Sequence, residues 1–125
     1  MEKCKILIID DESDITETLS YMLQARNFDV VTANSGQEGL DKVKRDRPDL
    51  ILLDIMMPGM PPKEIIANIK KDKKNKNTKI SYFSVVEFPE KEKKELLKEK
   101  NVVGYIQKPF TNEQLVKQVK VMLKR

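Results

Sequence analysis

Three acidic side chains in this chain directly follow short apolar runs with the composition of buried strands. Asp10 and Asp11 follow residues 6–9, and Asp54 follows residues 50–53. In an open parallel α/β sheet, the carboxyl ends of the strands lie along one edge, where ligands bind. Because both runs suit such a sheet, we expect the three carboxylates to lie close together.

Two further reactive groups come at the ends of later apolar runs. Ser84 closes the run of residues 80–83, and Lys108 follows residues 102–107 and precedes Pro109. A single aspartate, serine or lysine after a strand usually has a structural role in a turn. Groups of these types at the ends of several separate runs favour a common functional site.

The predicted cluster suits the transfer of a phosphoryl group to a carboxylate. Two like charges about 4 Å apart repel by ~4 kcal/mol at an effective dielectric constant of about 20, so Asp10, Asp11 and Asp54 would be unfavourable neighbours without a cation. Hard oxygen ligands and an open face favour Mg²⁺, or Mn²⁺ in its place. Asp54 would act as the nucleophile, Lys108 would supply a fixed positive charge, and Ser84 would donate from its hydroxyl group.

Apolar runs alternate with amphipathic segments along the chain, a pattern typical of repeated βα units. We expect strands at residues 5–9, 29–33, 50–53, 80–84 and 102–107. We expect helices over residues 14–26, from the capping box of Ser35 and Glu38 to just before Pro48, from Pro62 onward, over residues 89–100, and from the capping box of Thr111 and Gln114 onward. Right-handed crossovers then favour a doubly wound, five-stranded parallel sheet in the order 2-1-3-4-5, with helices on both faces.

The helix expected over residues 89–100 differs from the others because it has few apolar residues. Its only large apolar anchors are Leu96 and Leu97. We therefore expect this helix to be the most mobile element of the fold.

Length and composition indicate a single domain over residues 1–125. No apolar run approaches the ~20 residues of a membrane span, and no signal peptide is recognisable, so we expect no membrane partner. The single cysteine, Cys4, fits a reducing cytoplasm. The absence of histidine excludes Ser-His triads and the usual zinc sites.

The chain carries a formal net charge of +4, with acidic and basic residues interleaved through most of its length. Its densest basic stretch lies within residues 70–79 and contains no aromatic side chain that could stack on bases. We therefore expect no direct nucleic-acid binding. A solvated loop explains this stretch best, and an electrostatic docking site for an acidic partner is the alternative.

Taken together, these motifs resemble the receiver domain of two-component response regulators, of the stand-alone chemotaxis-regulator type. The resemblance covers the whole chain and rests on Asp10 and Asp11, Asp54 followed by residues 55–60, Ser84, and residues 104–110 with Tyr105, Lys108 and Pro109. It implies a flavodoxin-like fold and a signalling protein. Such a protein catalyses only its own phosphoryl transfer and a slow self-dephosphorylation.

The resemblance implies roles for the acidic residues. Asp54 would accept phosphate from the phosphohistidine of a histidine kinase or of a phosphotransfer protein. Asp10, Asp11 and Asp54 would bind Mg²⁺. The backbone carbonyl of Met56 would complete the set of protein ligands.

The resemblance also implies a switch. The Ser84 hydroxyl would move to bind the phosphoryl group, and the vacated space would let the Tyr105 ring turn inward. Lys108 would contact the phosphoryl group, and the peptide bond between Lys108 and Pro109 would be cis. The last helices and the last strand would form the face that contacts a downstream protein.

Three residues depart from the family pattern. Pro61 and Pro62 stand where the family usually has Asp and Gly, and proline fixes φ and removes an amide donor. Val85 follows Ser84 where the family prefers a smaller residue. These departures keep open a second interpretation, a receiver-like protein-interaction module that works without phosphorylation.

Two other classes of protein fit the motifs less well. Phosphohydrolases with an aspartate nucleophile resemble one another in an Asp-x-Asp pair, but Met56 stands two residues after Asp54 in this chain. A flavodoxin-like flavin binder would have to hold a phosphate in its first loop. Four acidic residues there would repel it: Asp10, Asp11, Glu12 and Asp14.

Overall fold

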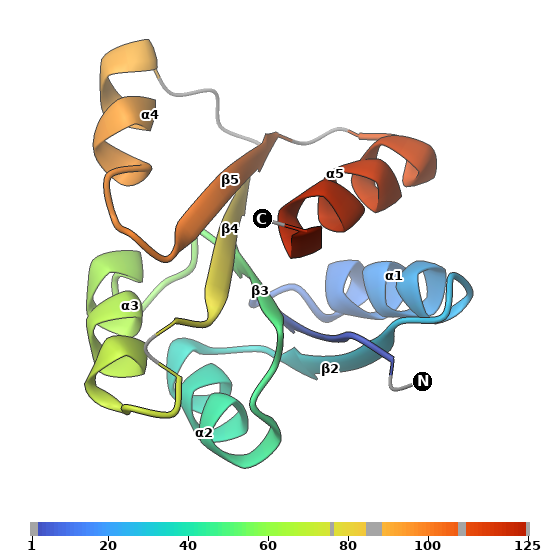
Figure 1. Ribbon diagram of the computed structural model, residues 1–125, viewed down its shortest axis with the longest axis horizontal. Helices are drawn as coiled ribbons and strands as arrows, with labels where there is room; N and C mark the ends of the chain where they lie inside the picture. Colours follow the sequence, from blue (N-terminus) through green and yellow to red (C-terminus); the bar gives the residue numbers. More distant parts are fainter. Residues whose placement is uncertain (1–2, 76, 85–88, 108–109, 125) are drawn as a thin grey trace.

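The computed structural model describes residues 3–75, 77–84, 89–107 and 110–124. Strands and helices alternate throughout this part of the chain (Figure 1). The strands are β1 (Lys5–Ile9), β2 (Asp29–Ala33), β3 (Leu50–Asp54), β4 (Lys79–Ser84) and β5 (Val102–Gln107). The helices are α1 (Ser13–Gln24), α2 (Gly36–Asp46), α3 (Pro62–Lys71), α4 (Glu90–Leu96) and α5 (Asn112–Lys124).

The five strands form one parallel sheet in the order β2-β1-β3-β4-β5. The predicted strand order and the flavodoxin-like α/β fold are therefore confirmed. The register pairs Ile9 with Ala33 and with Leu53, and it pairs Ser84 with Gln107. The carboxyl ends of the strands consequently lie along one edge of the sheet, as the location of the site requires.

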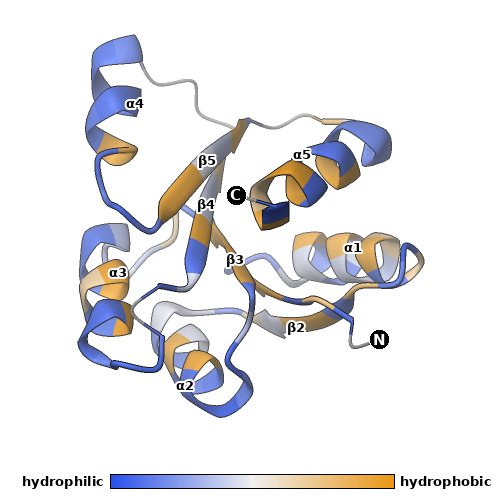
Figure 2. Cartoon of the chain, in the orientation of Figure 1, coloured by the Kyte–Doolittle hydropathy of each residue, from blue (hydrophilic) through white to orange (hydrophobic). Residues whose placement is uncertain are grey.

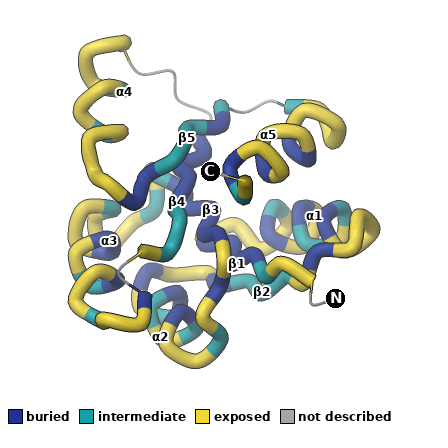
Figure 3. Tube along the Cα trace, viewed as in Figure 1, coloured by how far each residue is buried: buried dark blue, intermediate teal, exposed yellow. Residues whose placement is uncertain are grey.

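Each face of the sheet carries its own hydrophobic core. Successive side chains of a strand point to opposite faces, so Ile6 and Ile8 pack under α1 and α5 whereas Leu7 and Ile9 pack under α2 and α3. The continuous apolar runs of β1 and β3 follow from burial on both faces. Figure 2 shows β3 as largely apolar, and Figure 3 shows it as buried.

The helix ends follow local signals that the sequence contains. The Thr111 hydroxyl accepts from the Gln114 amide at 3.1 Å, and the Gln114 side chain accepts from the Thr111 amide at 2.9 Å, which is the predicted capping box. At α2, the Ser35 hydroxyl accepts from the Glu38 amide at 3.1 Å. The Glu38 carboxylate reaches one residue further back than predicted, to the amide of Asn34.

Helix α4 differs most from the prediction. It spans Glu90–Leu96, which is shorter than the expected 89–100, and none of its residues is buried. Leu96 packs against the core beneath α2 and α3. The expectation that Leu97 is a second anchor was wrong, because its side chain is 40% exposed. Loss of that anchor explains the early end of the helix, since short helices depend on tertiary packing.

Within the described ranges, no helix has both the length and the apolar character that a membrane span requires.

Candidate functional site

The three predicted aspartates meet at the carboxyl edge of the sheet. Asp10 and Asp11 follow β1, and Asp54 is the last residue of the neighbouring strand β3. One carboxylate oxygen from each residue can be chosen so that all three atoms lie within 4.8 Å of one another. Asp10 is fully buried, Asp54 is 7% exposed, and Asp11 faces solvent. The cluster therefore has a buried base and an open side.

Backbone contacts hold Asp10 in a fixed position. Its amide donates to the Ala33 carbonyl at 3.0 Å, which continues the pairing of β1 with β2 beyond the strand end. Its carboxylate accepts from the Glu12 amide at 3.0 Å. Its carbonyl accepts from the Asn34 side-chain amide at 2.9 Å. This carboxylate is thus positioned before any ligand binds.

Asp54 is oriented by a residue in the turn that follows β3. Its Oδ1 atom accepts from the Met56 amide at 3.1 Å. Met56 itself is 58% exposed. The loop that follows contains Gly59 at a φ of 89°, a backbone conformation that favours glycine, and it leads into α3 with Pro62 as the first helical residue.

Ser84 and Tyr105 lie beside the acidic cluster. Ser84 ends β4 and is fully buried, and Tyr105 lies on β5 and is partly buried. Burial raises the pKa of Tyr105 above its ordinary value, the nearby Asp54 carboxylate raises it further, and a hydrogen bond with Ser84 acts in the opposite direction. The Tyr105 hydroxyl group therefore lies near Ser84, and the negative charge of Asp54 acts on it.

Helix α4 contacts the Tyr105 ring through a lysine. The Lys93 Nζ atom lies over the Tyr105 ring, 5.6 Å from its centroid. A cation within about 6 Å of an aromatic ring is attracted to the ring face. The least buried helix of the fold thus contacts the aromatic residue that adjoins the acidic cluster.

The donor set of the cluster fits a hard divalent cation. The three carboxylates offer oxygen atoms close together, and such atoms are the preferred ligands of Mg²⁺ and Mn²⁺. The exposed position of Asp11 leaves room for water or phosphoryl oxygens to complete the coordination. The acidic triad can therefore bind a metal ion.

The structure brings most of the predicted site residues to one edge of the sheet. Asp10, Asp11, Asp54, Ser84 and Tyr105 are all there. The predictions for Lys108, Pro109 and Val85 fall outside the described residues.

Two residues that contact the site were not predicted from the sequence. Asn34 directly follows β2, so the rule that identified the aspartates could have found it. Lys93 has no comparable signal, because it is one of several lysines on a charged helix.

Comparisons with known proteins identify the same kind of domain. The family model "Response regulator receiver domain" matches residues 6–120. The alkaline phosphatase synthesis transcriptional regulatory protein PhoP of Bacillus subtilis is 33% identical over 124 residues, which cover 97% of this chain and 49% of that protein. The structure of chemotaxis protein CheY4 of Vibrio cholerae has a TM-score of 0.88 and 31% identity, covering 97% of this chain and 99% of that one. A CheY-like receiver domain protein from Methanospirillum hungatei has a TM-score of 0.84 and 25% identity, covering 98% and 95%.

The doubly wound α/β fold and the acidic triad at the carboxyl edge of the sheet are consistent with a signalling module of the phosphoacceptor kind. This chain belongs to the response regulator receiver domain family. It is therefore a signalling domain and not a conventional enzyme, and a histidine kinase is the general partner of such domains. The chain spans about half the length of the PhoP protein that it matches.

Proposed function

We propose that this domain accepts a phosphoryl group on Asp54 from the phosphohistidine of a histidine kinase or a phosphotransfer protein. The observation that carries the proposal is the approach of three carboxylates to within 4.8 Å at the strand ends. Asp54 is the member that also lies beside the Ser84 and Tyr105 hydroxyl groups. We also propose that the reaction takes place in the cytoplasm; the single cysteine supports this, because it fits a reducing compartment.

The transfer is a substitution at phosphorus. A carboxylate oxygen of Asp54 forms a bond to phosphorus while the phosphorus–nitrogen bond of the donor breaks, and the electron pair leaves with the imidazole. The Met56 amide holds Oδ1 of Asp54 and so fixes the direction in which the carboxylate faces. The product is an acyl phosphate on Asp54.

Asp10, Asp11, Asp54 and the carbonyl of Met56 would hold Mg²⁺ or Mn²⁺ at this site. When bound, the metal screens the negative charges of the carboxylates and of the phosphoryl oxygens. The hydrogen bond from Glu12 keeps the Asp10 carboxylate aimed at the cluster. Lys108 would add a second positive charge to the phosphoryl group.

The hydroxyl pair supports a switching role. Ser84 is hydrogen-bonded to Tyr105, and a phosphoryl group on Asp54 would compete for the Ser84 hydroxyl. A hydrogen bond to an anionic oxygen is roughly twice as strong as one between neutral groups, so the Ser84–Tyr105 bond would break. Tyr105 would then rearrange beneath Lys93 and pass the change to α4, β5 and α5, the face for a downstream protein.

The test is intact-mass analysis after incubation with acetyl phosphate and Mg²⁺. The wild type is expected to gain a single phosphoryl group, and the gain should disappear with a chelator and in Asp54→Asn. Asp29→Asn is the matched control, because Asp29 is an exposed aspartate at the opposite end of a strand and should leave phosphorylation unchanged.

Two results would contradict the proposal. The first is an adduct that survives Asp54→Asn, which would move the acceptor to another residue. The second is no adduct on the wild type with either acetyl phosphate or a phosphorylated kinase, which would favour the phosphorylation-independent module. In that second case Pro61→Asp with Pro62→Gly would show whether the two prolines block access to Asp54.

A further inference from the structure

The amino-terminal edge of the sheet holds a hollow that the phosphoryl site does not use. It has a volume of about 610 Å³, within the range of about 300–1,000 Å³ that is typical of ligand sites. It lies where β1 begins, where α1 ends and where α5 ends. Because β1 has five residues of about 3.3 Å each, roughly 16 Å separate this hollow from the acidic cluster.

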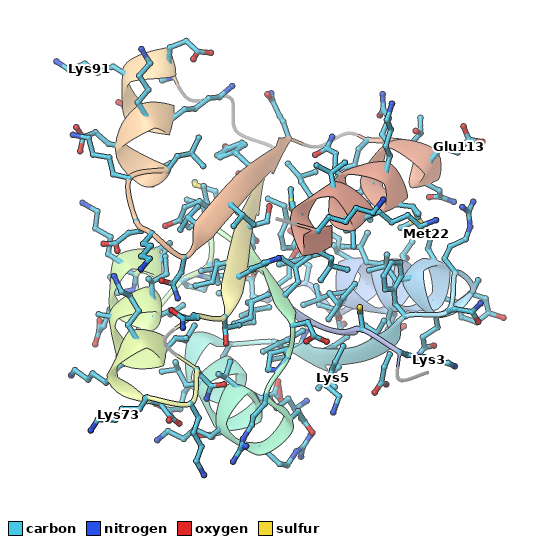
Figure 4. The ribbon with its side chains drawn as sticks, in the orientation of Figure 1. Lys3, Lys5, Met22, Lys73, Lys91 and Glu113 are labelled. Atoms are coloured by element: carbon cyan, nitrogen blue, oxygen red, sulfur yellow. The ribbon has the colours of Figure 1, made fainter. Side chains whose placement is uncertain are left out.

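Four cationic side chains surround the hollow, and no acidic residue of the described chain lines it. They come from separate segments: Lys3 lies beside the start of β1 (Figure 4), Arg26 follows α1, and Lys120 and Lys124 lie in the last turns of α5. All four are exposed. None has an ion-pair partner among the described residues.

Helix geometry accounts for only part of this arrangement. Cations near the end of a helix are favoured by the helix dipole, which explains Arg26 and Lys124 individually. Lys3 lies on neither helix, and Lys120 is one turn from Lys124, so the two like charges repel at a spacing that destabilises helices. A negatively charged occupant would stabilise all four cations together.

The floor of the hollow is apolar. Phe28, which is 8% exposed, and the partly buried Leu123 contribute to its lining. Asn27, which lies between α1 and β2 with a φ of 70°, also lines the hollow. An occupant therefore needs an apolar group as well as negative charge.

We propose that this hollow docks an acidic peptide segment of a partner protein, with an apolar side chain seated over Phe28 and Leu123. Several carboxylates on one segment match cations that come from three separate segments of the chain. Nucleic acid fits less well, because the nearly buried Phe28 ring cannot stack on a base. A membrane surface also fits less well, because membrane-binding surfaces project apolar side chains outward and this one recesses them.

The docking site would act independently of the phosphoryl site. It lies at the opposite edge of the sheet, so one partner could occupy it while a kinase reaches Asp54. The segment would thus hold the domain near a partner in both phosphorylation states. This inference goes beyond the proposed phosphoryl transfer and does not depend on it.

The test is an amide NMR titration of the protein with a peptide in which Leu-Phe is flanked by aspartate and glutamate residues. Shifts are expected at Cys4, Asn27, Phe28 and Leu123 around the hollow. Lys120→Glu should weaken binding about fivefold, the effect of an exposed charge contact worth about 1 kcal/mol, and adding Lys124→Glu should weaken it further. The reversal Lys91→Glu on the distant helix α4 is the matched control and should change affinity little.

Further titrations distinguish the acidic peptide from other possible ligands of the hollow. An acidic peptide without apolar residues should bind more weakly, and Asp54→Asn should bind the original peptide as the wild type does. The proposal fails if no shifts appear at millimolar peptide, if the shifts lie elsewhere, or if the all-polar peptide binds equally well. It also fails if anionic lipid vesicles or single-stranded RNA produce the same shifts at lower concentration.

Discussion

The two edges of the sheet carry opposite charges in different settings. At the carboxyl edge, three aspartates lie within 4.8 Å of one another, and two of them are buried. At the amino-terminal edge, four cations stand exposed around an apolar hollow. Neither the net charge of +4 nor the interleaved charges along the sequence indicate that acidic and basic groups gather at opposite edges.

The comparison shows how burial changes the cost of gathering like charges. Exposed cations are screened by water and salt, so the amino-terminal edge is tolerated at little cost. Carboxylates in a buried cluster repel by several kcal/mol, so a bound cation would stabilise the carboxyl edge. The acidic edge is therefore the better evidence for a bound cation, and the predictions below test this difference.

The largest effect is expected on metal affinity at the acidic edge. Asp11→Asn should lower the affinity for Mg²⁺ by about 100-fold, because a carboxylate contact with the metal contributes several kcal/mol. Isothermal titration calorimetry measures the change. Asp14→Asn, an exposed aspartate nearby on α1 but outside the cluster, should change the affinity by less than about threefold. Wild-type affinity in Asp11→Asn would remove that residue from the site.

A smaller effect is expected on stability without metal. Asp10→Asn preserves the acceptor for the Glu12 amide and removes one charge from the cluster. Urea unfolding in chelator should show a free energy of unfolding about 1–2 kcal/mol above that of the wild type, because repulsion is relieved.

With added Mg²⁺, the wild type should instead be more stable than Asp10→Asn, because a ligand stabilises the state that binds it. Asp29→Asn at the opposite end of the sheet should change stability by less than about 0.5 kcal/mol in either condition. If Asp10→Asn is less stable than the wild type even in chelator, then the native cluster is not strained.

The smallest effect is expected at the basic edge. Lys120→Gln removes a like-charge pair with Lys124 one turn along α5, so the free energy of unfolding should rise by about 0.3 kcal/mol at low salt. The gain should vanish at high salt because exposed charges are screened. Lys91→Gln should show no such gain, since Glu95 lies one turn beyond it on α4. A gain for Lys120→Gln that persists in high salt would mean that repulsion is not its cause.

Much of the fold was predictable because its signals are local. The predicted bounds of β1, β2 and β5 agree with the structure, since each strand is a short run rich in β-branched residues. Pro62 begins α3 as predicted, because proline suits the first helical position. Helix α4 was predicted too long, because no sequence signal shows that Leu97 faces solvent.

The two edges were not equally predictable. Aspartates that follow strands reach the same edge by the polarity of a parallel sheet, so Asp10, Asp11 and Asp54 could be grouped without coordinates. The cations of the hollow begin a strand or end helices, and their separation along the chain gives no comparable rule. Lys3 and Lys120 line the same hollow only because α5 packs against the face of β1.

The sequence by itself determined the order of strands and helices, the parallel sheet and the gathering of its carboxylates. The physical reason is that apolar periodicity and strand direction are properties of short segments. The tertiary structure alone decided the placement of Lys93 over Tyr105 and the gathering of four cations around the hollow that Phe28 lines. Those contacts depend on how helices from distant parts of the chain pack on the sheet, and no local pattern specifies that packing.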